Sequence, residues 1–132
     1  MKSPSGAALV TADAVALLAF VGVGMRSHQI DAIAEVAARN VVPLAVTWAM
    51  VSVVAGTYRR RDLASLLATW AIAVPLGLLA RTWWVGSPRS GRIAVFLGVG
   101  MVFTLVFLML GRGVAAAITR TRPVWRERAT AQ

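Results

Sequence analysis

Residues 11–28 read TADAVALLAFVGVGMRSH, and this stretch decides the fold because it places one acid inside a long apolar run. The run extends from about residue 7 to residue 25, close to the roughly 20 residues that cross a bilayer as a helix. It continues without a small-x-small cleavage site, so we expect it to be retained. Asp13 lies within the run, where a carboxylate is costly. The stretch therefore predicts a membrane helix whose acid needs an explanation.

The composition of the whole chain also indicates a membrane protein. Hydrophobic residues make up 58% of the 132 residues, and the mean hydropathy is +0.72, whereas soluble domains contain about 45–50% apolar residues. The net charge is +9, but the basic residues cluster between apolar runs, which favours contact with anionic lipid headgroups over nucleic acid. The chain has no cysteine, which excludes disulfides and thiol chemistry.

Four apolar segments predict an all-α, polytopic bundle of four transmembrane helices. They form one domain, residues 1–118, with spans at about 7–25, 36–55, 63–81 and 93–113, followed by a basic tail at 119–132. The second helix is expected to begin near Asp31, with a kink at Pro43. Gly56 suits the end of that helix, and Asp62 suits the N-cap of the next.

Basic residues predict how the chain is threaded, because cytoplasmic loops carry more Lys and Arg. With four spans, both termini lie on one side. Nine basic residues fall on that side: Lys2, Arg59, Arg60, Arg61, Arg112, Arg120, Arg122, Arg126 and Arg128. Five fall on the other: Arg26, Arg39, Arg81, Arg89 and Arg92. The bias predicts cytoplasmic termini in a prokaryotic plasma membrane. Headgroup contacts are expected from Arg59, Arg60, Arg61, Arg112, Arg120 and Arg122.

Asp13 is expected about 9 Å from the cytoplasmic end of its helix. Four polar residues of the other helices fall near the same depth, and we expect an intramembrane polar layer of Asp13, Ser52, Thr69, Trp70 and Thr104. Their hydroxyl and indole groups are candidate hydrogen-bond donors to the carboxylate. Three interpretations stay open: a structural clamp, a titrating carboxyl used in transport, and a contact with another subunit or with headgroups.

A second polar group is expected at the opposite, outer face, from Arg26, His28, Asn40, Arg81 and Arg92. Arginine forks suit phosphate and carboxylate, so these residues form a candidate oxyanion site; the alternative is interfacial snorkelling. A lone histidine with few nearby acids does not argue for a metal site, and no cofactor is expected. Common catalytic motifs are missing from the sequence.

Several motifs occur in a distinctive order along the chain. They are Asp13, GMRSH at residues 24–28, Pro43-Leu44, Trp70, the Gly77 and Arg81 pair, and Leu110-Gly111-Arg112. From about residue 10 to 113 this order resembles domain-of-unknown-function family 3054, small prokaryotic four-helix membrane proteins. Met25 replaces an expected arginine, and a tryptophan expected before Arg112 is missing. The resemblance implies a compact membrane domain, implies no established activity, and marks Asp13, Arg26 and His28.

The function predicted from these observations is that of a non-enzymatic membrane subunit. Its partners would be the bilayer and either a larger membrane complex or further copies of itself, since small residues recur at helical spacing along the spans. One alternative is a small oligomeric proton-coupled transporter that uses Asp13. A second alternative is an intramembrane lipid-handling enzyme that uses the outer arginines.

Overall fold

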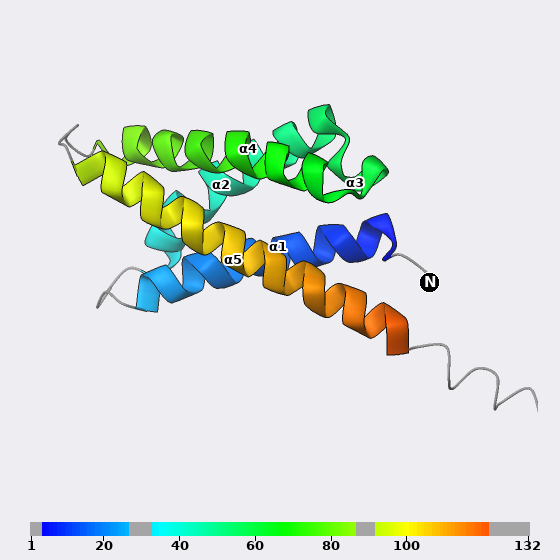
Figure 1. Ribbon diagram of the computed structural model, residues 1–132. Helices are drawn as coiled ribbons and strands as arrows, with labels where there is room; N and C mark the ends of the chain where they lie inside the picture. The colour runs from blue at the N-terminus through cyan, green and yellow to red at the C-terminus, as the bar shows by residue number, and fades with distance from the viewer. Residues whose placement is uncertain (1–3, 27–32, 87–91, 122–132) are drawn as a thin grey trace, which may run out of the picture.

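The computed structural model describes residues 4–26, 33–86 and 92–121, and all regular structure in these ranges is helical. The elements are α1 (Gly6–Arg26), α2 (Ile33–Ala55), α3 (Thr57–Arg60), α4 (Leu63–Val85) and α5 (Arg92–Thr121). All except α3 are long and apolar enough to cross a membrane. The predicted all-α membrane bundle is therefore confirmed (Figure 1).

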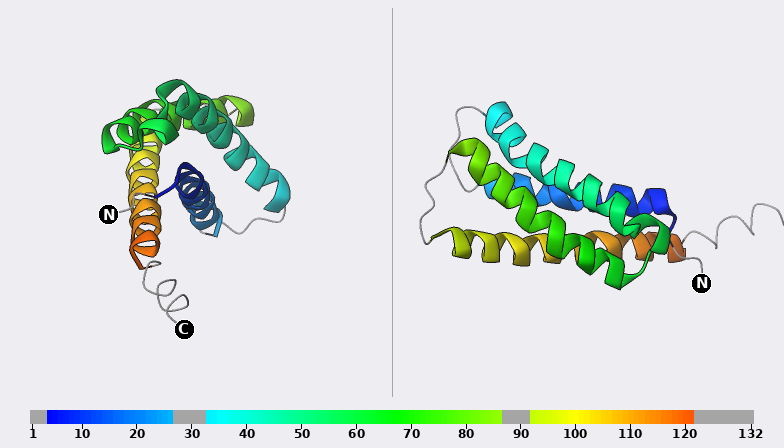
Figure 2. Two further views of the ribbon diagram at one scale, coloured as in Figure 1. Left: turned by 90° about the vertical axis from the view of Figure 1, so that its right-hand side faces the viewer. Right: turned by 90° about the horizontal axis from the view of Figure 1, so that it is seen from above.

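The four long helices are arranged as two closely packed pairs, α2 with α4 and α1 with α5 (Figures 1 and 2). Glycine permits the close approach within each pair. A Cβ atom at Gly77 of α4 would lie 2.9 Å from Leu44 Cα of α2, and one at Gly111 of α5 would lie 3.0 Å from the Ala12 carbonyl oxygen of α1. Contacts between the two pairs are less extensive.

The helix α3 is a single turn that the sequence did not predict, and it marks one end of the bundle. At this α3 end, α1 and α4 begin and α2 and α5 finish; we call the opposite end the far end (Figure 1). Gly56 ends α2 with φ of 65° in the left-handed region. Asp62 caps α4 by accepting a 2.7 Å hydrogen bond from the Ser65 amide. The predicted helix boundary at Gly56 and the predicted N-cap at Asp62 are thus confirmed.

Helix bounds differ from the predicted spans mainly at their ends. The helix α2 begins at Ile33 and stays helical across Pro43; Asp31 lies outside the described residues. The helix α4 runs on to Val85, where the exposed Trp83 and Trp84 suit a membrane interface. The helix α5 continues to Thr121, beyond the predicted end of the span at 113 and into the predicted tail, because no proline interrupts it.

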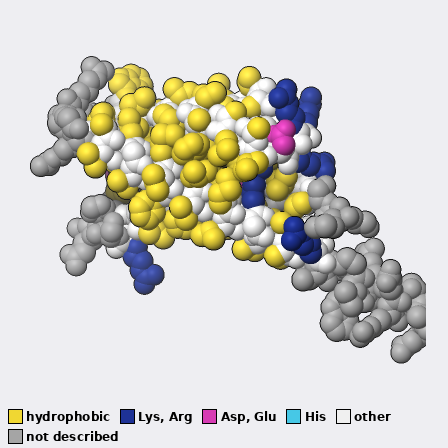
Figure 3. All heavy atoms as spheres, in the orientation of Figure 1, with side chains coloured by type: hydrophobic (Ala, Val, Ile, Leu, Met, Phe, Trp, Pro, Cys, Tyr) yellow, Lys and Arg dark blue, Asp and Glu magenta, His cyan; other side chains and the backbone are white. Residues whose placement is uncertain are grey.

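The interior and the surface of the bundle are both largely apolar. Buried leucine, valine, alanine and tryptophan side chains of all four long helices form one core. Large apolar side chains on every long helix are also exposed, and Val54 reaches 89% exposure. Figure 3 shows apolar side chains over the middle of one face, with most of the visible basic side chains gathered towards the α3 end. This distribution suits a protein surrounded by lipid.

Candidate functional site

The buried acid of α1 is paired with an arginine of α5. Arg112 donates two hydrogen bonds to Asp13, from Nε to Oδ1 at 2.9 Å and from Nη2 to Oδ2 at 2.7 Å. The side chain of Asp13 is 1% exposed and that of Arg112 is 13% exposed. A two-pronged arginine–carboxylate contact fixes orientation as well as neutralising charge. The site therefore joins the first and last long helices by an interior ion pair.

The ion pair forms at a close approach of α1 and α5. Gly111 lies against the Ala12 carbonyl oxygen and the Ala16 Cβ atom, so the next residue, Arg112, is held beside Asp13. Burial of two charges is expensive, but their attraction in a low dielectric and the two hydrogen bonds offset much of that cost. Small residues at the crossing thus make the pairing sterically possible.

The helix α3 contributes a tyrosine to the same region. The Tyr58 hydroxyl accepts a 2.9 Å hydrogen bond from Trp48 Nε1 of α2 and lies near the Asp13 and Ser52 side chains. Burial raises the pKa of Tyr58 above its ordinary value of 10.0, and the negative charge of Asp13 acts in the same direction. Tyr58 is therefore a neutral hydroxyl at physiological pH, and it was not among the residues predicted from the sequence.

Apart from the half-buried Trp70, the predicted polar layer is buried, but three of its members bind groups other than the carboxylate. The Thr69 hydroxyl pairs with that of Thr57, Trp70 Nε1 donates to the Met101 carbonyl oxygen at 3.1 Å, and the Thr104 hydroxyl donates to the Gly100 carbonyl oxygen at 2.6 Å. Ser52 Oγ is buried without a hydrogen-bond partner among the described residues. The expectation that these groups solvate Asp13 is corrected, since Arg112 supplies the strong donors.

The prediction that Arg112 contacts lipid headgroups is likewise wrong. Arg112 was expected at the membrane surface because the span was predicted to end near residue 113. The helix α5 instead continues for two further turns, and Arg112 lies in the interior. Arg59, Arg60, Arg61 and Arg120 are exposed near the α3 end, where headgroup contact stays a prediction. Arg122 lies outside the described residues.

At the far end, the structure brings together two of the predicted outer-face residues. Arg81 Nε of α4 donates a hydrogen bond to Asn40 Oδ1 of α2, and the guanidinium carbon lies 5.2 Å from the centre of the Phe96 ring of α5. Arg26 is exposed at the end of α1, and Arg92 is the first residue of α5. His28 lies outside the described residues.

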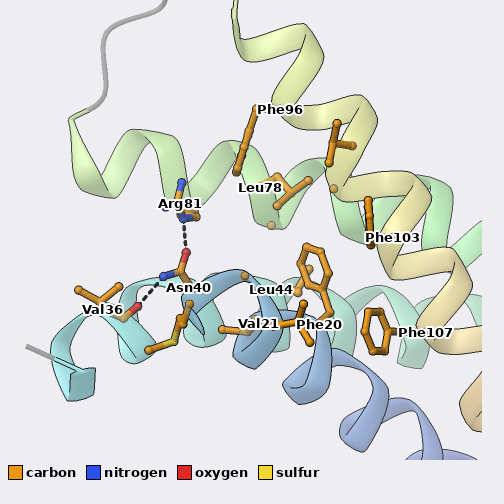
Figure 4. Close-up of a pocket in the computed structure, with 16 residues that line it drawn as sticks. Phe20, Val21, Val36, Asn40, Leu44, Leu78, Arg81, Phe96, Phe103 and Phe107 are labelled. Atoms are coloured by element: carbon orange, nitrogen blue, oxygen red, sulfur yellow. Dashed lines mark hydrogen bonds between the residues drawn. The ribbon is translucent and has the colours of Figure 1, made fainter. Parts of the chain in front are cut away.

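A cavity of about 460 Å³ adjoins the Arg81–Asn40 pair. Residues of all four long helices line it, and most of them are apolar (Figure 4). Figure 4 shows Arg81 and Asn40 facing each other on one side, with the rings of Phe20, Phe103 and Phe107 on the other. The sequence predicted the basic residues at this end, but it did not predict the apolar cavity beside them. Within the described ranges, no cluster of His, Cys, Asp or Glu is suited to hold a metal ion.

Comparison with known proteins gives one family match. The model described as "Protein of unknown function (DUF3054)" matches residues 10–115, which covers most of the chain and confirms the resemblance carried by the motif order. No curated protein and no solved structure matches the chain.

Proposed function

Because this chain belongs to the DUF3054 family and its four long apolar helices mark a multi-pass membrane protein, we propose that it is a non-enzymatic membrane subunit. It acts by assembling, either with further copies of itself or within a larger membrane complex. The membrane is the prokaryotic plasma membrane, and both termini face the cytoplasm. Asp13 serves as a fixed structural clamp in this assignment.

The observation that carries the proposal is the Asp13–Arg112 ion pair. A carboxyl that carries protons must gain and lose its charge during the transport cycle. Here the carboxylate is 1% exposed, and the guanidinium of Arg112 holds it with two hydrogen bonds in a fixed geometry. The pairing supports a structural role and disfavours the proton-coupled transporter.

The proposed orientation follows from the distribution of basic residues. The exposed arginines of α3 and the exposed Arg120 lie at the α3 end together with the start of α1. Cytoplasmic faces carry such residues, where they meet anionic lipids. A reporter enzyme fused after Gln132 should be active only in the cytoplasm, and activity confined to the outside would refute this orientation.

Assembly is supported by how little of each span the bundle itself buries. In each span, at most 39% of an apolar stretch of 18 residues is buried inside the bundle, and for α5 the buried share is 17%. Such apolar faces suit helix partners as well as lipid, and small residues on several spans permit close packing.

The proposal is tested by extracting the full chain in a mild detergent and identifying everything that co-purifies. Light scattering and native mass spectrometry should find an assembly larger than one chain. Recovery as a monomer alone would refute the assembly function.

Transport is tested separately in proteoliposomes that contain a pH-sensitive dye. Wild type and Asp13→Asn should both show background proton flux. Flux in the wild type that Asp13→Asn abolishes, while the variant still folds, would instead establish the transporter.

A further inference from the structure

The cavity at the far end has the size and lining of a ligand site. Its volume of about 460 Å³ falls in the range of roughly 300–1,000 Å³ that is typical of small-molecule pockets. The C-terminal half of α1, the N-terminal half of α2, the last turns of α4 and the first half of α5 line it. It is separate from the Asp13–Arg112 ion pair, which lies towards the α3 end.

The lining is apolar except at one place. Phenylalanines of α1 and α5 and leucines of α2 and α4 face the space, and Arg81 and Asn40 are its strongly polar members (Figure 4). Glycines contribute to the lining, so parts of the wall carry no side chain. An extended apolar chain in this cavity would therefore contact mainly carbon atoms.

Arg81 brings a charge to the cavity for which the described residues supply no counterion. The ion pairs among these residues join Arg112 to Asp13 and Arg39 to Glu35. The remaining described acid, Asp62, caps α4 at its opposite end. Arg81 uses its Nε to bind Asn40, which leaves the two terminal nitrogens of its fork for an oxyanion.

The position of Arg81 along α4 matches the geometry of a lipid. Arg81 precedes the end of α4 at Val85 by four residues, about 6 Å along the axis. The exposed Trp83 and Trp84 mark this end as a membrane interface. Phe107, by contrast, lies fifteen residues into α5 from Arg92, towards the middle of the bundle. A head at Arg81 would therefore lie near the interface and its chain would point inward.

We propose that this cavity binds a single-chain amphiphile with an anionic head, its carboxylate or phosphate held by Arg81 and its apolar chain lying among the phenylalanines. Asn40 orients the guanidinium through the hydrogen bond to Nε, and Phe96 supports its face. This binding is independent of the assembly function proposed above.

The test measures ligand binding to the full chain in nanodiscs of zwitterionic lipid. The probes are palmitate, a lysophosphatidate with the same chain, neutral hexadecanol, and inorganic phosphate. Native mass spectrometry counts bound molecules, and titration with radiolabelled palmitate gives the affinity. Wild type should bind one palmitate or one lysophosphatidate per chain, and both should bind more tightly than hexadecanol or inorganic phosphate.

Two variants separate the head site from the chain site. Arg81→Gln removes the charge and should weaken both anionic amphiphiles by about ten- to a hundredfold while leaving hexadecanol unchanged. Gly24→Phe should block the cavity and weaken all three amphiphiles. A Cβ atom built at Gly24 would meet no heavy atom of the described residues within 4 Å, so the ring has space to enter.

Two further variants serve as matched controls. Gly22 also has no described heavy atom within 4 Å of a built Cβ, but it does not line the cavity, so Gly22→Phe should bind like wild type. Arg39→Gln removes another arginine of the same end, which already pairs with Glu35 and does not line the cavity, and it should also leave the affinity unchanged. Circular dichroism establishes that each variant is folded; if Arg81→Gln is not, Arg81→Lys replaces it and should show an intermediate loss.

Several results would overturn the proposal. One is an affinity for palmitate that neither the Arg81 variant nor Gly24→Phe changes. Another is equal binding of hexadecanol and palmitate, which would show that the charge is unused. Equal loss in Arg39→Gln and Arg81→Gln would assign the effect to general surface charge. Binding of inorganic phosphate as tight as that of lysophosphatidate would leave no role for the apolar chain.

Discussion

Removing one member of the Asp13–Arg112 pair should destabilise the bundle far more than removing both. Asp13→Asn keeps the shape of the side chain but leaves the guanidinium of Arg112 without its counterion. Arg112→Met keeps much of the length of the side chain but leaves the carboxylate of Asp13 without its donors. The double variant carries neither charge. The structure therefore provides a complete double-mutant cycle at one contact.

The expected magnitudes follow from burial. Leaving one buried charge unpaired costs about 3–5 kcal/mol, whereas replacing both members of a pair by uncharged groups is often nearly neutral. Arg112→Met should lie towards the upper end of this range, because the stranded Asp13 side chain is 1% exposed. Asp13→Asn should cost less, because the Arg112 side chain is 13% exposed and its long stem can carry the charge outward.

The free energy of unfolding can be measured by titrating sodium dodecyl sulfate into mixed micelles and following the far-ultraviolet circular dichroism. The double variant should lose less stability than either single variant. If the losses of the two single variants simply add in the double variant, or if Asp13→Asn is as stable as the wild type, the ion pair does not hold α1 to α5 and the reasoning fails.

Other sites allow further predictions. Gly77→Ala should destabilise by about 1–3 kcal/mol in the same titration, because its Cβ atom would lie 2.9 Å from Leu44 Cα, whereas Gly98→Ala meets no described heavy atom within 4 Å and should be neutral or slightly stabilising. Tyr58→Phe should cost about 1–3 kcal/mol, because Trp48 Nε1 loses its acceptor; a stability unchanged from wild type would contradict this. Because folding raises the pKa of Tyr58, this residue adds stability at pH values below its pKa in the unfolded state. That stability is lost as the pH rises through the pKa of the folded state, and the ultraviolet titration of Tyr58 should be centred above 10.0. The hydrogen bonds from Ser65 lower the pKa of Asp62. The stability that Asp62 adds is therefore present above its pKa in the unfolded state and is lost as the pH falls through the lower pKa of the folded state. In Asp62→Ala the melting temperature should depend less on acid pH.

The helices could be predicted from the sequence because a long apolar segment in a bilayer must form its backbone hydrogen bonds internally, as a helix does. The cap at Asp62 and the turn at Gly56 were predictable for a similarly local reason, since both depend on residues a few positions apart. The helix α3 was missed because one turn of helix, Thr57–Arg60, leaves no periodicity to detect.

The partner of Asp13 could not be found in the same way. Arg112 is separated from it by 99 residues, and its depth depends on how far α5 continues and where it crosses α1. Gly111, beside Arg112, is one of the small residues along the spans that permit close packing, but a glycine in the sequence does not indicate which helix approaches it. The far-end cavity depends on the same packing, because it forms between side chains of four helices.

The sequence separation of the ion pair also has a consequence for biosynthesis. Asp13 emerges from the ribosome 99 residues before Arg112. At a synthesis rate of about 5–20 residues per second, roughly 5–20 s pass between the synthesis of Asp13 and that of Arg112. During that interval α1 carries its acid without the arginine partner, and a nascent chain cut short before α5 never acquires that partner. The pairing therefore forms only after α5 has been synthesised, so it distinguishes a chain that contains α5 from one cut short before it.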